Sequence, residues 1–530
     1  MGRSEVWEGE SMQDGGPGVE VLGVKMGGGR GGRDGALSSQ LNGDWREWVL
    51  CEDSRDEVDR LAFRARPDVP LRELFVTAPN SEDIRYAHPS QPVWLGYGDH
   101  TTGPSRSRFG RQWMYTPPPL VFPFRADRGW SGVAVAADSG QNLFSSVSYE
   151  PVDDRTFEVV VHYERQRHVG PGTARLMLAA REWSSPAEVV ASYARRLRES
   201  GAAPSPRRSP EEWWADTFVC TWGEQCNIQN EMGANGRKSL IEHPVVSYES
   251  QANQMRWISH LVGQGIPVGV VSTSDKWQRD RYRLIPDAGR YEDLAGFGRW
   301  NHAAGRHVIA WWGLWSVDGA PREWCICDGD GNPLSVDPGN AEYRQVVADD
   351  VARLLSPSGY DLDGFFLDFT ARQAPRPGDG PAPKAGIELL HSYIALVHGA
   401  AKAAKPGAMI MTHCPHPYFA DVTDVLRLND WALRRPNIVE QASYRRQIAA
   451  SCSDWLINTD NWPMYDIDQW RQYLRYQPEI GIPASWFTHG VFGEGDRKYG
   501  EFTPNDYAVW RETWVSYRKR LGLPELGGDA

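Results

Sequence analysis

Carboxylates able to do acid–base chemistry stand at the ends of short apolar segments in the second half of this chain. The clearest is Asp368, which follows the bulky residues of "GFFLDF" at 364–369. Asp275 ends an earlier segment, and Asp430 and Asp460 end two later ones. Two carboxyl groups held close together can cleave a glycosidic bond, because one attacks or activates water while the other protonates the leaving oxygen. The pattern therefore favours cleavage of glycosides.

The other segments of this kind end on indole or imidazole side chains. These ends are Trp222, Trp315, His413 and His489. The chain holds 24 tryptophans, and indole rings form flat surfaces on which the apolar faces of sugars stack. Carboxylates combined with aromatic rings predict a pocket for a carbohydrate.

The elements that must position these side chains follow a repeating strand–helix order. Eight apolar segments alternate with amphipathic helical patterns, which is typical of a (β/α)8 TIM barrel, an α/β fold. We expect the strands at 217–222, 267–275, 307–315, 364–369, 408–413, 424–430, 455–460 and 483–489. In such barrels the active site lies at the carboxyl ends of the strands, where all these polar ends would meet. Asp361 and Asp363 precede their strand, so we expect them at the opposite end.

The first part of the chain has a different pattern. Short alternating strands between turn residues predict an N-terminal antiparallel β-sandwich at 16–200, closed by a connecting helix at 185–200. Residues 1–15 are expected to be disordered, and the proline-rich segment 201–210 is expected to link the sandwich to a catalytic barrel at 211–530.

Composition excludes several classes of function. A net charge of −12 without a basic cluster argues against binding to nucleic acid. Seven scattered cysteines predict no disulfide framework, and the absence of a long apolar run predicts a protein without a membrane contact and with a cytoplasmic location. The sequence leaves the oligomeric state open, a homo-oligomer included.

Cofactor and metal motifs are weak. Gly27, Gly29 and Gly32 match a dinucleotide-binding pattern, but no apolar helix follows them, so we expect no cofactor. His413 and His416 stand three residues apart, but a metal site needs a third ligand, and none stands at suitable spacing. We therefore expect no metal. A metal-dependent TIM-barrel hydrolase built on these histidines stays as an alternative.

Several of these motifs resemble one known group of enzymes. "YDLDGFFLDFT" is similar to the fourth-strand motif of clan D glycoside hydrolases (families 27, 31 and 36, which include α-galactosidases and α-glucosidases). "VVSTSDKW" resembles the second strand of that clan, "HVIAWWGLW" the third, "DVLRLNDW" the sixth and "INTD" the seventh. The resemblance covers about 215–490, and a β-sandwich before the barrel is also usual in the clan.

The resemblance implies a role for each matching residue. Asp368 would be the nucleophile and Asp430 the acid/base of a retaining glycoside hydrolase, or a transglycosylase, that acts on α-linked glycosides by double displacement. Asp275 and Trp277 would bind sugar hydroxyls, and Arg427 would orient the substrate or Asp430. The pocket would also be lined by Trp222, Trp312, His413, Asp460, Trp486 and His489.

The chain also departs from the clan's pattern. Phe366 stands where a lysine or tryptophan is common, and Phe369 and Thr370 stand where asparagine or cysteine often follows the nucleophile. The sugar and its linkage therefore stay open. A non-catalytic carbohydrate-binding protein is the second alternative.

Overall fold

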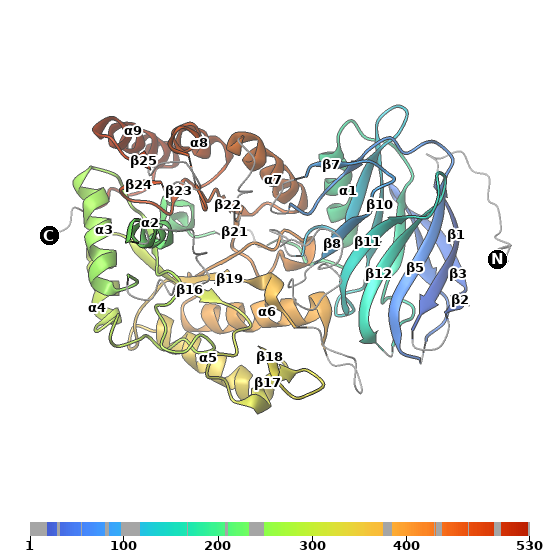
Figure 1. Cartoon of the computed structure of the whole chain (residues 1–530), viewed down its shortest axis with the longest axis horizontal. Coiled ribbons are helices and arrows are strands. Elements are labelled where there is room, and N and C mark those ends of the chain that lie inside the picture. Colours follow the sequence, from blue (N-terminus) through green and yellow to red (C-terminus); the bar gives the residue numbers. More distant parts are fainter. Residues whose placement is uncertain are drawn as a thin grey trace.

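The computed structural model describes residues 19–28, 32–54, 56–79, 84–96, 117–166, 168–206, 210–232, 248–374, 384–428, 430, 437–464, 466–491 and 500–527. The predicted disordered segment 1–15 and Gly29 of the glycine motif lie outside these residues. Two bodies lie side by side along the long axis, a β-sandwich that holds the first strands and a barrel that holds the later ones (Figure 1).

The sandwich consists of two antiparallel sheets. The first sheet has the order β2 (Arg33–Gly35), β1 (Val19–Gly27), β5 (Val58–Pro67), β12 (Phe157–Gln166), β11 (Phe144–Pro151) and β8 (Val93–Gly96). The second has the order β3 (Leu37–Asn42), β4 (Trp45–Leu50), β13 (Arg175–Ala179), β10 (Trp130–Ala136), β9 (Val121–Arg125), β6 (Leu74–Phe75) and β7 (Tyr86–Ala87). The alternating side chains that predicted these strands pack between the sheets, as Val159 and Val161 of β12 do. The predicted sandwich is confirmed.

The connecting helix α1 (Pro186–Glu199) covers one face of the sandwich. It begins at Ser185, whose side chain accepts a hydrogen bond from Glu188 N, and Pro186 occupies the first turn, where a missing N–H costs nothing. The Trp45 indole donates to Ser192 Oγ at 3.1 Å and so ties the helix to the sheet. At its other end Arg198 donates to the Cys452 carbonyl of the barrel at 2.9 Å. The helix therefore contacts both bodies.

Eight parallel strands form the barrel. Their order is β22 (Leu456–Asn458), β21 (Val425–Arg427), β20 (Met409–Thr412), β19 (Gly364–Asp368), β16 (His307–Gly313), β15 (Val270–Ser272), β14 (Phe218–Cys220) and β23 (Ala484–Ser485). The ring closes between the first and last of these, where Ile482 N donates to Ile457 O at 2.7 Å and Thr459 N donates to Ile482 O at 3.1 Å. All eight predicted strands are present in the predicted order, and the predicted TIM-like barrel is confirmed.

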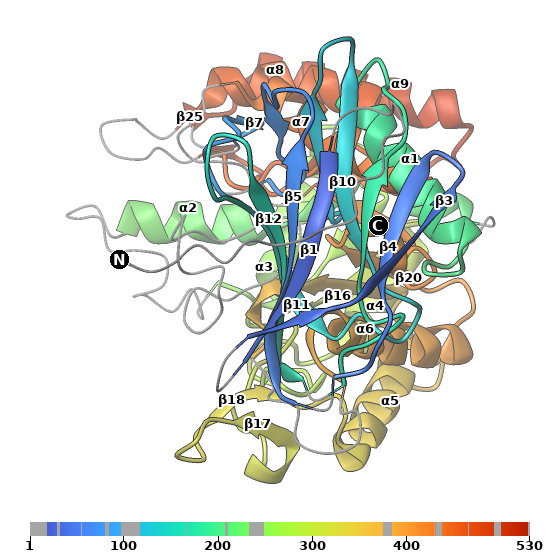
Figure 2. The same ribbon diagram turned by 90° about the vertical axis from the view of Figure 1, so that its right-hand side faces the viewer.

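Helices surround the strands. They are α2 (Trp222–Met232), α3 (Gln251–Gly263), α4 (Leu294–Ala303), α5 (Ala341–Leu355), α6 (Gly386–Ala404), α7 (Ile438–Cys452), α8 (Ile467–Ile480) and α9 (Pro504–Leu521). Most begin at a side chain that accepts a backbone hydrogen bond, as Ser250, Asn340 and Thr503 do. Figure 2 looks onto the sandwich with the barrel behind it, and shows α8 and α9 above and α5 below. None of the helices in the described part of the chain has the length and apolar character needed to cross a membrane.

The polar residues before β19 lie at the amino end of the barrel. Asp363 is buried and accepts hydrogen bonds from Val308 N and Lys405, and its carboxylate also contacts the His302 ring at 2.8 Å. Lys405 binds Asp361 as well, at 2.9 Å. These contacts fix the strand's start, so among the aspartates of this segment only Asp368 reaches the carboxyl end.

A loop of the sandwich holds the beginning of α6, the helix that follows β19. Glu388 N donates to the Asn142 carbonyl at 2.8 Å. Gly386 has a φ of +56°, and a Cβ there would lie 2.2 Å from the Phe144 carbonyl oxygen, so the backbones approach as closely as a glycine allows. The sandwich is thereby fixed against the barrel on the side that carries Asp368.

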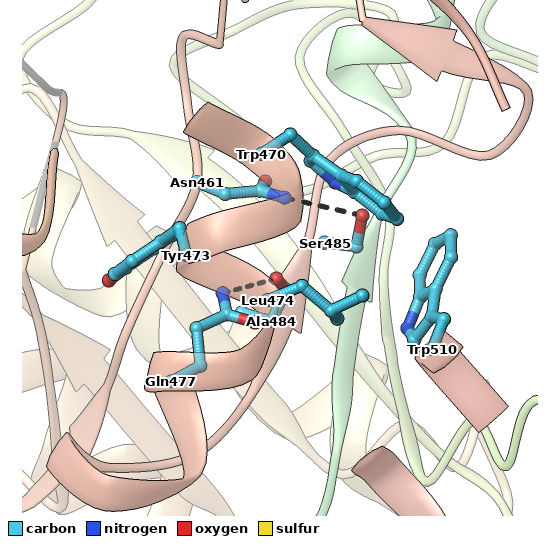
Figure 3. Close-up of a pocket in the computed structure, with 8 residues that line it drawn as sticks. All are labelled: Asn461, Trp470, Tyr473, Leu474, Gln477, Ala484, Ser485 and Trp510. Carbon is cyan, nitrogen blue, oxygen red and sulfur yellow. Dashed lines mark hydrogen bonds between the residues drawn. The ribbon is translucent and has the colours of Figure 1, made fainter. Parts of the chain in front are cut away.

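Two side-chain amides form hydrogen bonds with the backbone of β23 and of the residue after it, where the barrel closes. Asn461 Oδ1 accepts a hydrogen bond from Trp486 N at 2.8 Å, and Gln477 of α8 donates to the Ala484 carbonyl at 2.8 Å. Figure 3 shows both side chains among tightly packed aromatic rings of α8 and α9. Asn461 and Gln477 therefore fix the position of Trp486 at the end of β23.

Candidate active site

A cavity of about 200 Å³ opens at the carboxyl ends of the barrel strands. Its polar lining consists of Ser274, Asp275, Asp368, Arg427 and Asp430. Its apolar lining consists of Cys220, Trp222, Trp311, Phe366, Phe369, Trp462 and Trp486. Carboxylates and aromatic rings thus meet in one cavity, which is the arrangement that the strand ends predict.

Asp368 is held as a carboxylate. Phe369 N donates to its Oδ1 at 2.8 Å, and the Trp311 indole donates to its Oδ2 at 3.2 Å. Burial opposes its ionisation, but Arg427, 3.7 Å away, and the nearby His413 outweigh burial and hold the pKa of Asp368 below its usual value. The group is therefore ionised at neutral pH, as a nucleophile must be.

Arg427 is the centre of the charged cluster. Its Nε donates to Asp460 at 2.6 Å and its Nη2 donates to Asp430 at 2.7 Å. Its guanidinium lies over the rings of Phe366 and Trp486, at 4.8 and 5.2 Å from their centroids. Arg427 and Asp460 are both fully buried, so this pair fixes the guanidinium, and the guanidinium in turn fixes Asp430 beside Asp368.

Asp430 has the opposite electrostatic environment from Asp368. Removal from solvent raises the pKa of Asp430, Arg427 opposes the rise, and the charges of Asp368 and Asp460 add to it. The direction holds although 38% of the side chain is exposed, because the two neighbouring carboxylates act in the same sense as burial. Two nearby carboxyl groups with pKa values driven apart provide one base or nucleophile and one acid.

Asp275 lines the cavity but is already paired. Arg281 Nη2 contacts both of its carboxylate oxygens, at 2.9 and 2.6 Å. Burial raises the pKa of Asp275, and Arg281 and Lys276 oppose the rise. Asp275 still belongs to the lining of the cavity, beside Ser274 and Asp368.

The four predicted tryptophans fall into two groups. Trp222 and Trp486 line the cavity. Trp312 lies outside the lining because β16 pleats its side chain outward, where its ring meets Tyr393 of α6 at 5.8 Å. Trp277 is fully buried and donates from its indole to the Trp311 carbonyl at 2.6 Å. Trp311, whose side chain lies on the opposite face of β16 from that of Trp312, lines the cavity instead.

His413 lies beside Asp368 without lining the cavity. Its Nε2 contacts Thr370 Oγ1 at 2.5 Å, and its Nδ1 lies 3.9 Å from Asp368 Oδ1. His489 is placed differently, since its ring stacks on His260 at 4.1 Å and its Nδ1 contacts Glu224 at 3.1 Å. His413 is therefore close enough to lower the pKa of Asp368, whereas His489 packs with His260 and Glu224 after β23.

Backbone strain is concentrated at the strand ends. Lys276, Phe369 and Asp460 each have a positive φ, of 80°, 58° and 52°. Lys276 and Phe369 each follow a polar strand end, and Asp460 is itself one. Left-handed conformations of such residues occur often at functional sites, where the surrounding structure enforces them. Phe369 turns the chain so that its own N–H points back to the Asp368 carboxylate.

The histidines of the metal alternative diverge. His416 is buried, with its Nε2 at 3.3 Å from the Tyr193 hydroxyl and its Nδ1 accepting from Tyr418 N. Its partners are thus distinct from those of His413. Within the ranges that the structure describes, no three histidine, cysteine, aspartate or glutamate side chains are grouped so that they could hold a metal ion.

The cavity also contains residues that the sequence analysis missed. Trp311, Trp462, Ser274 and Cys220 line it, and only their neighbours Trp312, Asp275 and Trp222 were expected there. The register between β16 and β19 could have identified Trp311. Trp311 pairs with Phe366, which lies two residues before Asp368 and therefore on the same face of β19 as Asp368. Trp462 lies in a loop, so no periodic signal marks it.

No family model matches the chain, and no curated protein matches its sequence. Its fold, however, is shared with solved structures of glycoside hydrolases. An α-galactosidase from Thermus thermophilus, in complex with p-nitrophenyl α-D-galactopyranoside, is 17% identical with a TM-score of 0.56, over 86% of this chain and 91% of that one. A structure of that enzyme with stachyose is 16% identical with a TM-score of 0.56, over 90% and 99% of the two chains. A cycloalternan-degrading enzyme from Trueperella pyogenes is 13% identical with a TM-score of 0.57, over 93% and 74%.

At these identities the likeness is one of fold. It extends over both the sandwich and the barrel, since each match covers most of this chain. The architecture that the resemblance to clan D glycoside hydrolases implies is therefore confirmed.

Proposed function

We propose that the protein is a retaining glycoside hydrolase, or a transglycosylase of the same chemistry, that acts on α-linked glycosides. The observation that carries the proposal is the placement of Asp368 and Asp430 on one guanidinium, with the pKa of Asp368 lowered and that of Asp430 raised. The fold shared with an α-galactosidase and a cycloalternan-degrading enzyme supports the substrate class.

The reaction would proceed in two displacements. Asp368 Oδ attacks the anomeric carbon while the protonated Asp430 gives its proton to the leaving oxygen, so that a glycosyl ester forms on Asp368 and the aglycone departs as an alcohol. Asp430, now ionised, takes a proton from water or from an acceptor hydroxyl. The activated oxygen attacks the anomeric carbon and releases Asp368 as a carboxylate.

The other residues of the cavity would assist these steps. Arg427 would keep Asp368 ionised and Asp430 in place, and Asp275 would accept a hydrogen bond from a sugar hydroxyl. Trp222, Trp462 and Trp486 would stack on the apolar faces of the sugar and exclude water, which strengthens the charge interactions around the reacting bond.

The test is turnover of aryl α-glycosides, starting with p-nitrophenyl α-D-galactopyranoside and α-D-glucopyranoside. We expect hydrolysis with retention at the anomeric carbon, followed by NMR, and a loss of at least about 10³-fold in kcat for Asp368→Asn. Asp349→Asn, on the outer surface of α5, is the matched control and should keep the wild-type rate.

Each alternative predicts a different outcome. Wild-type protein that binds these sugars in calorimetry but turns over none of them would support the carbohydrate-binding protein. Stoichiometric zinc in the purified protein, with loss of activity on chelation, would support the metal-dependent hydrolase. Inversion at the anomeric carbon would contradict the retaining mechanism.

A further inference from the structure

A buried carboxylate joins two segments that carry cavity tryptophans, and the proposed reaction does not use it. Strands β14 and β23 are neighbours in the barrel, and Trp222 and Trp486, which follow them, both line the cavity. Trp222 is the first residue of α2 and Glu224 is the third. Glu224 is only 4% exposed. A buried carboxylate has to be satisfied by hydrogen bonds or by opposite charge, so its partners indicate its role.

The described residues that contact this carboxylate lie just after Trp486. Its Oε2 accepts hydrogen bonds from Thr488 N at 3.0 Å and from His489 N at 3.1 Å, and its Oε1 contacts His489 Nδ1 at 3.1 Å. Burial opposes the ionisation of Glu224, but His489 and Thr488 outweigh burial and hold the pKa of Glu224 below its usual value. Both backbone N–H groups therefore donate to a charged acceptor, which makes these bonds stronger than bonds to a neutral group.

The backbone of α2 is joined to the same segment. Glu224 N donates to the Trp486 carbonyl at 3.1 Å. A Cβ at Gly223 would lie 2.5 Å from that carbonyl oxygen, so the start of α2 packs directly on the Trp486 backbone. Asn227, further along α2, donates to the Gly490 carbonyl at 2.6 Å. Together these contacts tie the start of α2 to residues 486–490.

The two tryptophans differ in how firmly their surroundings hold them. Trp486 is 2% exposed, and Asn461 and Gln477 fix its position. Trp222 is only partly buried, and its ring meets the Trp462 ring edge-on at 6.3 Å. The position of Trp222 therefore depends on where α2 begins, and Glu224 sets that point relative to Trp486.

We propose that Glu224 is a positioning residue for substrate binding, which holds Trp222 in its place beside Trp486 without touching the substrate. The inference rests on the proposed function, because it needs Trp222 to contact the sugar or the leaving group. Glu224 is not part of the cavity lining, so its effect reaches the substrate through Trp222. Its removal should weaken substrate binding and leave the chemistry of Asp368 and Asp430 unchanged.

The experiment is a double-mutant cycle on Glu224 and Trp222, with kcat and KM measured on p-nitrophenyl α-D-galactopyranoside and α-D-glucopyranoside. Glu224→Ala should raise KM about tenfold, the value of one aromatic contact, while kcat stays within about threefold and its pH dependence is unchanged. Trp222→Ala should raise KM by a similar factor. In the Trp222→Ala background, Glu224→Ala should add less than about twofold, because the ring that Glu224 positions is gone.

Conservative variants separate positioning from general stability. Glu224→Gln keeps an oxygen that can accept from Thr488 N and His489 N, so it should restore most of the wild-type KM. Glu224→Asp keeps the charge on a side chain one methylene shorter, so it should raise KM, and it replaces Glu224→Ala in the cycle if that variant does not fold. Glu388→Ala is the matched control, because Glu388 is also buried and is also the third residue of a helix, α6. It should lower the stability in urea and leave KM unchanged with or without Trp222.

The failures are distinguishable. Active wild-type protein whose KM is unchanged in Glu224→Ala overturns this inference and leaves the proposed function intact. A KM that rises by the same factor with and without Trp222 also overturns it, because Glu224 then does not act through Trp222. Wild-type protein inert on both glycosides overturns the proposed function and this inference with it.

Discussion

Replacement of Arg427 by lysine tests how one side chain separates the roles of two aspartates. The guanidinium contacts three carboxylates at once, at 2.6 Å from Asp460, 2.7 Å from Asp430 and 3.7 Å from Asp368. A lysine keeps the charge, but its single ammonium group cannot lie between all three. Because Asp460 is fully buried, the ammonium is expected to stay with Asp460 and to leave the other two.

The magnitude follows from the contacts that are lost. A hydrogen bond between charged groups contributes about 1.5–3 kcal/mol, and Arg427→Lys loses the bond to Asp430 and weakens the attraction to Asp368. A loss of about 3 kcal/mol in the transition state lowers kcat/KM by about 100-fold. With the positive charge further from Asp368, the pKa of Asp368 should rise, and the acidic limb of the pH profile should move to higher pH.

The assay is the pH dependence of kcat/KM on an aryl α-glycoside, with urea unfolding of each variant. Arg471→Lys is the matched control, because Arg471 also contacts two carboxylates, Asp468 and Asp506, but lies between α8 and α9 away from the cavity. It should lose some stability and keep full activity. If Arg427→Lys keeps a kcat/KM within about threefold of wild type and an unmoved acidic limb, Arg427 does not separate the roles of the two aspartates.

Substitutions of Asp430, Trp311 and Gly386 each test one further feature of the structure. Because the pKa of Asp430 is raised to about 7, its acid form and the activity should decline as the pH rises through that value. Asp430→Asn should abolish this basic limb and lower kcat by about 10²–10⁴-fold on glycosides with poor leaving groups, but far less on 2,4-dinitrophenyl glycosides. An unchanged basic limb in this variant would contradict the assignment of Asp430 as the acid. Trp311→Phe removes the indole donor to Asp368 and should lower kcat/KM about tenfold with an acidic limb at higher pH; an identical pH profile would show that this contact does not act on Asp368. Gly386→Ala should lower the free energy of unfolding, measured in urea, by about 2 kcal/mol or more, because the new Cβ would meet the Phe144 carbonyl at a positive φ. Gly263→Ala, a position with open space around it, should not lower it, and equal effects of the two substitutions would contradict the close approach of the sandwich and the barrel.

The strands of the barrel could be predicted because each is a short apolar run that ends on a carboxylate, an imidazole or an indole side chain. "GFFLDF" is a strand in the structure as Gly364–Asp368, and the same holds for "HVIAWWGLW", which contains His307–Gly313. Parallel strands that are buried on both faces require continuous apolar residues, so their sequence signal is strong. Their polar ends could then be assigned to one edge of the sheet, which is where the cavity lies.

The facing of individual side chains was harder to predict. Trp311 and Trp312 are adjacent in one apolar strand, and nothing in their own residue types says which one points inward. The answer depends on the pairing of β16 with β19, where Trp311 lies opposite Phe366. The fully buried carboxylate of Glu249 could not be predicted for a related reason. Its hydrogen-bond donors are Gln225, Gln254, Ser274 and Tyr291, which belong to four separate segments and meet only in the folded barrel.

The central claim, that Asp368 forms a covalent glycosyl ester, is tested most directly by trapping that ester. The protein would be incubated with a fluorinated glycosyl fluoride that forms the intermediate quickly and releases it slowly, then digested and mapped by mass spectrometry. We expect one label per chain, on Asp368, with no label in Asp368→Asn and faster turnover of the label when an acceptor sugar is added. A label on Asp275, Asp430 or Asp460, or an active protein that takes up no label, would contradict it.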